Sequence, residues 1–179
     1  MKILKTRNDI LKTLPENLKI AEIGVFIGDF SKEIYKITNP KELVLIDLFK
    51  GQAHSGDKDG ENIIYANLEE EYLKLIDYFK YDRVKIIKDY SYNALSRFKD
   101  NYFDFIYIDG DHSYKGVKRD LELAFLKVKP NGYIVGHDYN IIRFPGLVKA
   151  ADEFCQLYNL KIEILTEDKL PSYVIKNIK

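Results

Sequence analysis

The chain has 179 residues, 46% of them hydrophobic and 31% charged, which is typical of a folded domain and excludes disordered and fibrous proteins. Its 28 basic and 28 acidic side chains cancel, so no net field draws it onto nucleic acid or an anionic membrane. Cys155 is the sole cysteine, which excludes an internal disulfide and a multi-cysteine metal site. We therefore expect a cytoplasmic protein whose partner is a small molecule, with self-association left open.

Short apolar runs alternate with segments of helical periodicity, which is typical of a parallel sheet built from βαβ units. Residues 1–17 are predicted to form a leading helix that ends at Pro15 and packs across the sheet edge, and residues 18–179 to form the rest of a single domain. The predicted strands are 18–23, 42–46, 84–87, 103–108 and 133–136. The predicted helices are 31–37, 67–79, 117–128 and 147–158.

The polar segment 50–62 contains three glycines and is predicted to lack regular structure, so it is a candidate lid over a ligand. His54 lies in this segment. It is a candidate for substrate contact, although a lone loop histidine is more often simply solvated.

Two strand-like runs, 161–165 and 172–175, end the pattern. Only about six residues join them, too few for a crossover helix, so they are expected to pair antiparallel. The predicted fold is therefore a Rossmann-like α/β protein, with a mostly parallel sheet, a C-terminal antiparallel hairpin and helices on both faces.

A glycine-containing turn joins the first predicted strand to the next helix, in the string AEIGVFIGDFS (residues 21–31). Gly24 and Gly28 allow close backbone approach to a ligand, although such a turn needs glycine for steric reasons about as often. The string lacks GxGxxG, which disfavours a nicotinamide-dependent oxidoreductase. Asp47 ends the next strand, where it is expected to accept hydrogen bonds from ribose hydroxyls; the alternative is a cap or loop acid.

The densest cluster of ionisable residues follows two later strands. IYIDGDHSY (106–114) carries Asp109, Asp111 and His112, and GHDY (136–139) carries His137 and Asp138. Parallel strands present their carboxyl ends at one rim of the sheet, where such folds bind ligands. Because burying these groups without partners would be unfavourable, the pattern predicts a shared site.

These strings, with LVLIDLF and LKVKPNGYIVGHDY, resemble the class I S-adenosylmethionine-dependent methyltransferases. Within them, the chain is similar to a small family related to macrocin-type O-methyltransferases and cephalosporin-hydroxylase-like proteins. The resemblance covers residues 21–139 and implies a set of cofactor-binding positions. These are Glu22, Gly24 and Gly28 at the methionine end, Asp47 at the ribose, Asp89, Tyr90 and Ser91 along the adenine, and Asp109.

The same resemblance implies a divalent cation such as Mg²⁺ on Asp109 and Asp138, with His112 as general base beside Asp109. His137 stands where metal-dependent relatives often carry a second acid, and magnesium prefers oxygen ligands. The alternative for His112 is a structural hydrogen bond across the turn.

The expected activity is O-methylation of a small hydroxylated acceptor, a sugar or a secondary metabolite. The main alternative is a non-catalytic nucleotide-binding or interaction module that retains the cofactor pocket. A nucleic-acid methyltransferase is disfavoured by the neutral charge. Cys155 falls on the apolar face of a predicted helix and is expected to be a buried, inert thiol.

Overall fold

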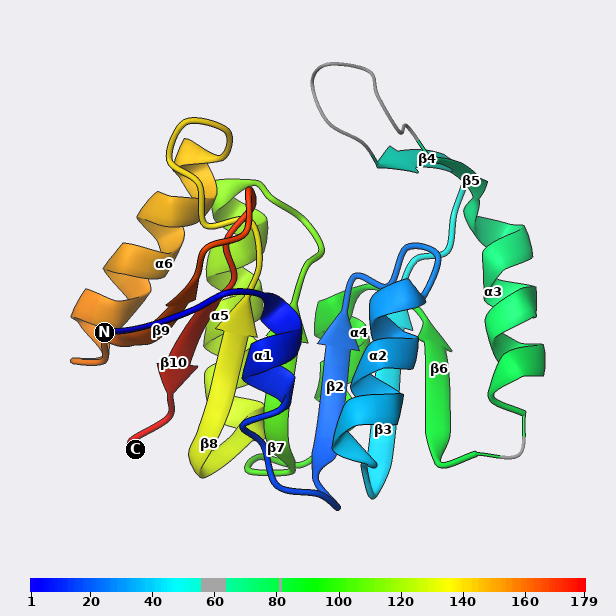
Figure 1. Cartoon of the computed structure of the whole chain (residues 1–179), viewed down its shortest axis with the longest axis horizontal. Coiled ribbons are helices and arrows are strands. Elements are labelled where there is room, and N and C mark those ends of the chain that lie inside the picture. The colour runs from blue at the N-terminus through cyan, green and yellow to red at the C-terminus, as the bar shows by residue number, and fades with distance from the viewer. Residues whose placement is uncertain (56–63, 81) are drawn as a thin grey trace.

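The computed structural model describes residues 1–55, 64–80 and 82–179, and its centre is an eight-stranded sheet (Figure 1). The strand order is β1-β9-β10-β8-β7-β2-β3-β6. Strands β8, β7, β2, β3 and β6 run parallel, whereas β10 is antiparallel to both β8 and β9. Their bounds are β1 (Lys2–Leu4), β2 (Lys19–Ile23), β3 (Glu42–Asp47), β6 (Val84–Lys88), β7 (Phe103–Ile108), β8 (Val128–Gly136), β9 (Ile162–Thr166) and β10 (Tyr173–Lys176). The predicted fold class is confirmed.

Helices cover both faces of this sheet, and each set packs into its own apolar cluster. Figure 1 shows α1 and α2 in front of the strands and α4 and α5 behind them. One face is covered by α1 (Arg7–Leu11), α2 (Asp29–Thr38) and α3 (Leu68–Tyr78), and the other by α4 (Ser91–Ser96), α5 (Tyr114–Lys127) and α6 (Pro145–Leu157). The central strands are therefore buried on both sides.

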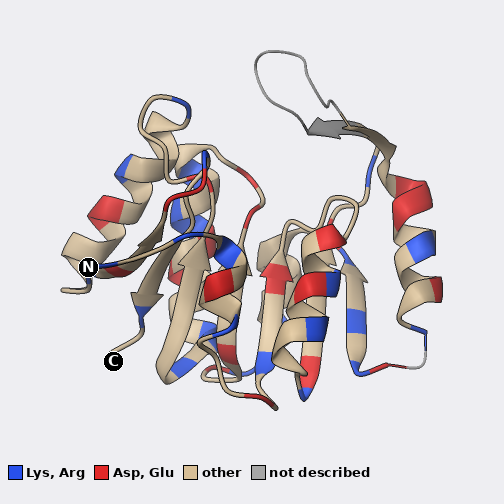
Figure 2. Cartoon of the chain, viewed as in Figure 1, with Lys and Arg blue, Asp and Glu red and all other residues tan. Residues whose placement is uncertain are grey.

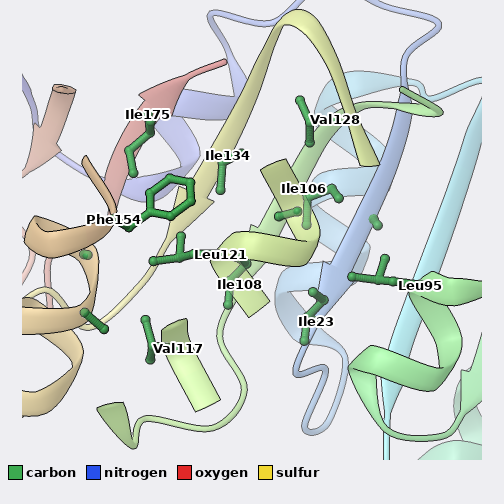
Figure 3. Packing of buried hydrophobic residues seen from close by; sticks show 14 of the residues in the cluster. Ile23, Leu95, Ile106, Ile108, Val117, Leu121, Val128, Ile134, Phe154 and Ile175 are labelled. Atoms are coloured by element: carbon green, nitrogen blue, oxygen red, sulfur yellow. The ribbon is translucent and has the colours of Figure 1, made fainter. Parts of the chain in front are cut away.

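Strand β7 shows how the sequence produces this two-sided core. Phe105 and Tyr107 point to the α1 and α2 side, while Ile106 and Ile108 point to the α5 and α6 side. Figure 3 shows Ile106 and Ile108 packed near Leu121 of α5. Because both faces are covered, the strand is apolar from Phe105 to Ile108, and its one charged residue, Asp104, lies near its start. Fully burying each large side chain contributes about 1.5–3 kcal/mol.

Cys155 lies in the α6 part of this core and is buried, as expected. Burial raises the pKa of its thiol to about 11, so the reactive thiolate is scarce at neutral pH.

The prediction of a leading helix over residues 1–17 is wrong in most of its length. Residues Lys2–Leu4 form β1, which pairs parallel with β9, and the helix is only Arg7–Leu11. It begins where the Asp9 carboxylate accepts a hydrogen bond from the backbone N–H of Thr6. The helix also lies on the face of the sheet, with Ile10 in one apolar cluster with strands β2 and β7, and not across the edge.

The segment 50–62 also departs from expectation. Residues Gln52–Ser55 form β4, which pairs antiparallel with β5 (Ile64–Asn67) at the carboxyl-end side of the sheet (Figure 1). His54 lies in β4 opposite Tyr65, and its side chain is outside the described part of the chain. Residues 56–62 are likewise outside it, so the lid stays a prediction.

Charged side chains of both signs are interleaved on the helices, as Figure 2 shows for α2 and α3. This pattern agrees with the zero net charge and gives no extended basic face on the elements in view. Within the described residues, no helix combines the length and apolar character needed to cross a bilayer.

Candidate active site

A cavity of about 970 Å³ opens at the carboxyl ends of the parallel strands, and its wall brings together nearly all of the predicted site residues. The predicted residues in this wall are Glu22, Gly24, Asp47, Asp89, Tyr90, Ser91, Asp109, His112 and Asp138. Gly28 is not part of the wall. The groups come from loops after β2, β3, β6, β7 and β8, so parallel strands converge them on one rim.

The two predicted glycines serve the backbone in different ways. Gly24 has φ +85°, and a Cβ there would lie 2.0 Å from the carbonyl oxygen of Asp109, so only glycine lets these loops touch. Gly28 has φ +78° at the start of α2, where a Cβ would meet the side chain of Leu75. Gly28 thus has a packing role that needs no ligand.

Asp47 ties together the loops that follow β2 and β3. Its Oδ2 accepts hydrogen bonds from the backbone N–H groups of Val25 (2.7 Å) and Phe26 (3.1 Å), and its Oδ1 accepts one from Phe49 (2.9 Å). A carboxylate can accept about four hydrogen bonds, so this one retains capacity for a ligand hydroxyl. The loop-acid role is present in the structure, and the ribose role stays a prediction.

Glu22 is a buried carboxyl group at the methionine end of the predicted cofactor site. It is 2% exposed and accepts a hydrogen bond from Ser31. Burial raises the pKa of Glu22 to about 8, although Ser31 and the nearby Arg7 oppose this. A ligand ammonium group in the cavity would favour the charged carboxylate, so the site suits an amino-acid-bearing ligand.

The residues predicted to edge the adenine lie at the start of α4. Asp89 accepts hydrogen bonds from the Tyr90 N–H (2.8 Å) and from Asn93, and it pairs with Arg97. Ser91 donates a hydrogen bond to the buried Asp120 (2.6 Å). Tyr90 remains half exposed at the cavity wall, so it offers a flat ring to a ligand.

A cluster of two carboxylates and two imidazoles forms the other end of the cavity. His112 Nε2 lies 2.7 Å from Asp138 Oδ2 and 3.5 Å from Asp109 Oδ1. His137 Nδ1 lies 3.1 Å from Asp138 Oδ1 and 3.4 Å from Asp109 Oδ2. Phe144 stacks on the His112 ring with 4.7 Å between centroids, which orients the imidazole. The predicted convergence of these residues is confirmed.

These contacts change the charges of all four groups. Contacts with Asp109 and Asp138 raise the pKa of His112 to about 9. Burial disfavours a charged His137, but its contacts with the same carboxylates raise its pKa to about 9 as well. Despite their own burial, Asp109 and Asp138 have pKa values below the ordinary range because the imidazoles face them. Without a metal, both imidazoles therefore carry a proton at neutral pH.

The free energy of unfolding of the metal-free protein is expected to fall as the pH rises from about 6.5 to about 9. A histidine whose pKa is raised on folding stabilises the folded state, and its contribution is complete below the unfolded-state pKa of about 6.5. For His112 and His137 this contribution is lost as the pH rises through about 9. Urea unfolding at successive pH values in the presence of a chelator measures this slope. Asp138→Asn should make the free energy of unfolding less dependent on pH. Equal slopes in the variant and the wild-type protein would contradict the pairing of Asp138 with the two histidines.

The chain matches the family of methyltransferase domains over residues 21–139. It belongs to that family. In sequence, the chain is 30% identical over 139 residues, or 76% of its own length, to protein R132 of Acanthamoeba polyphaga mimivirus. The chain spans 58% of that relative's length.

Solved structures with the same fold include two methyltransferases and a spermidine synthase. The O-methyltransferase NovP has a TM-score of 0.68 at 19% identity, covering 97% of this chain and 80% of NovP. The N-methyltransferase NodS of Bradyrhizobium japonicum WM9 has a TM-score of 0.62 at 13% identity, covering 97% and 95%. Spermidine synthase of Thermotoga maritima has a TM-score of 0.62 at 16% identity, and the match covers 93% of this chain and 56% of the synthase. These likenesses show a class I methyltransferase fold, and the acceptor has to be argued from the site.

The cavity has lining residues that sequence reasoning missed. Arg7 lines the cavity, with its guanidinium 4.0 Å above the Phe30 ring and 3.7 Å from Asp109. No local pattern signals this position, because the pairing of β1 with β9 brings it there. Arg143 and Phe144 also line the cavity, and their place shortly after the GHDY string was the one available signal.

Proposed function

We propose that this chain transfers a methyl group from S-adenosylmethionine to a hydroxyl oxygen of a small acceptor, a sugar or a hydroxylated secondary metabolite. One observation carries the proposal: a single cavity joins the Glu22 and Asp47 end to the cluster of Asp109, His112 and Asp138. The first end supplies groups for a nucleoside that bears an amino acid. The second supplies groups that handle a proton.

The donor half of the cavity recognises the methyl donor through three groups. Asp47 accepts hydrogen bonds from ribose hydroxyls while it holds the loops after β2 and β3. Glu22 pairs with the ammonium group, whose charge compensates the buried carboxylate. Tyr90 lies along the adenine ring. Together they place the reacting end of the donor toward Asp109.

The acceptor half orients a hydroxyl group and removes its proton. When bound, S-adenosylmethionine supplies a methyl group that its sulfonium has already activated. The reaction requires that water be excluded, for which Phe144 in the cavity wall is suited, and that the acceptor oxygen lie within about 3–3.5 Å of the methyl carbon. His112 Nε2, once it has lost its own proton, would take the hydroxyl proton as the oxygen–carbon bond forms and the carbon–sulfur bond breaks with its electron pair left on sulfur.

The cluster also suits a divalent cation, which supports the proposed metal assistance. Asp109, His137 and Asp138 each offer a donor atom, and these atoms lie within 4.8 Å of one another. Asp138 Oδ1 is buried and makes an ion pair with His137 but no well-directed hydrogen bond among the described residues, which leaves it free to face an ion. A cation held there would lower the pKa of a neighbouring acceptor hydroxyl.

Calorimetry with S-adenosylmethionine and with its demethylated product tests the donor site. Asp47→Asn should weaken the affinity for both ligands by about tenfold or more. Both oxygens of the carboxylate accept hydrogen bonds from backbone N–H groups, and the amide would turn its NH₂ group toward one of these donors. Asp100→Asn is the matched control, since its carboxylate pairs with Lys127 outside the cavity.

An acceptor screen that follows the demethylated product, with and without divalent ions, tests the reaction itself. Failure of the wild-type protein to bind the nucleoside would remove the proposal. Tight binding without turnover on any hydroxylated acceptor would favour the non-catalytic nucleotide-binding module.

A further inference from the structure

Two carboxylate oxygens and one imidazole nitrogen lie close together in the wall of the cavity. His137 Nδ1 lies 3.1 Å from Asp138 Oδ1 and 3.4 Å from Asp109 Oδ2. The positions come from the backbone: Asp109 directly follows β7, and His137 and Asp138 directly follow β8. The backbone N–H of His137 donates a hydrogen bond to the backbone carbonyl of Ile108 (3.0 Å), and this bond joins the ends of β7 and β8. The donor atoms are therefore held before any ion arrives.

An independent observation points to a ligand among these atoms. Asp138 is 5% exposed, and its Oδ1 lies 3.1 Å from His137 Nδ1, an ion pair that lacks the geometry of a hydrogen bond. A buried carboxylate oxygen without a well-directed hydrogen bond is unfavourable unless an ion or other group satisfies it. Asp138 also adopts φ +61°, an uncommon backbone conformation for a residue with a side chain, and such strain often accompanies ligand sites.

The chemistry of the donors separates the candidate ions. Mg²⁺ requires oxygen ligands in near-octahedral geometry, and an imidazole nitrogen is a poor ligand for it. Nitrogen donors suit first-row transition metals, whose affinity rises from Mn²⁺ through Co²⁺ toward the end of the series. Two carboxylates with one imidazole thus resemble a transition-metal site more than a magnesium site.

We propose that Asp109, His137 and Asp138 bind a divalent transition-metal ion in preference to magnesium. The nitrogen ligand of His137, its Nδ1 atom, decides this preference. The inference rests on the metal assistance proposed above and deepens it. The expected magnesium ion is replaced by an ion that accepts nitrogen. Ion binding can be measured without methyl transfer, so this inference and the proposed function can fail separately.

Titration of chelator-treated full-length protein with Mg²⁺, Mn²⁺, Co²⁺ and Zn²⁺ by calorimetry tests the preference. One Co²⁺ or Zn²⁺ per chain should bind about 100-fold more tightly than Mg²⁺, and bound Co²⁺ should show visible absorption bands of a nitrogen-containing ligand set. Equal affinities for Mg²⁺ and Co²⁺ would overturn the proposal. So would the absence of any stoichiometric ion, which would leave a cluster of carboxylates and protonated imidazoles.

Two variants assign the preference to one residue. His137→Asp should reduce the ratio of Co²⁺ to Mg²⁺ affinity by about tenfold or more and change the Co²⁺ bands. His112→Gln removes the neighbouring imidazole, which is outside this donor set, and should keep the ratio. If His137→Asp does not fold by circular dichroism, shifts of the His137 ring signals on Zn²⁺ addition to the wild-type protein replace it. Unshifted signals would overturn the assignment.

The outcomes also separate this inference from the proposed function. Binding of S-adenosylmethionine without an ion preference refutes the inference and leaves the function. A strong preference for Co²⁺ in a protein that does not bind the nucleoside refutes the function and leaves the inference.

Discussion

Replacing His112 with alanine is expected to lower methyl transfer by about 10² to 10⁴-fold, the usual contribution of a positioned general base. Affinity for S-adenosylmethionine should be retained, because Glu22 and Asp47 lie at the other end of the cavity. The wild-type rate should rise with pH as His112 loses its proton. In the metal-free protein its pKa is about 9, and a bound cation would lower that value. Single-turnover assays across pH measure both effects.

A second substitution separates proton transfer from a structural hydrogen bond. His112→Gln keeps an amide N–H that can face Asp138, which His112 Nε2 now approaches at 2.7 Å, but it cannot take a proton at neutral pH. Loss of turnover in both variants supports the base role. Full activity in His112→Gln assigns His112 to structure, and full activity in His112→Ala removes it from the reaction.

Replacing Gly24 with alanine is expected to destabilise the fold by about 3 kcal/mol or more, because the new methyl group meets backbone atoms on a strained backbone. The Cβ would lie 2.0 Å from the Asp109 carbonyl oxygen and 2.7 Å from the Gly110 nitrogen, at φ +85°. Since those atoms belong to the loop that carries Asp109, the two halves of the cavity would separate. Cofactor affinity should fall along with the free energy of unfolding, measured by urea titration.

Gly51→Ala is the matched control for this effect. Gly51 has φ +76°, but no atom of residues 1–55, 64–80 and 82–179 lies within 4 Å of the Cβ position. Only the left-handed backbone conformation then opposes alanine, at about 1 kcal/mol. If the two variants lost equal stability, the close approach at Gly24 would not matter.

The predicted convergence of the site residues could be read from the sequence because they occur at the ends of recognisable strands, whereas their roles toward a ligand stay predictions. Asp47, Asp109 and Asp138 each follow an apolar run, and parallel strands necessarily bring such ends to one rim. Gly28 was assigned to the ligand from its place in the glycine-containing turn and from the family resemblance, and the structure packs it against Leu75. A local pattern does not distinguish a glycine that contacts a ligand from one that makes room for a helix.

The sequence by itself determined the strand alternation, the class of fold and the rim on which the acids meet, because these follow from periodicity within short segments. Only the tertiary structure decided what the first residues do: β1 pairs with β9, some 160 positions away, and so places Arg7 beside Asp109. It also decided the ionisation of His112 and His137 and placed Asp138 Oδ1 beside the His137 imidazole. Burial and charge at these atoms depend on groups from distant strands, and no local pattern encodes those distances.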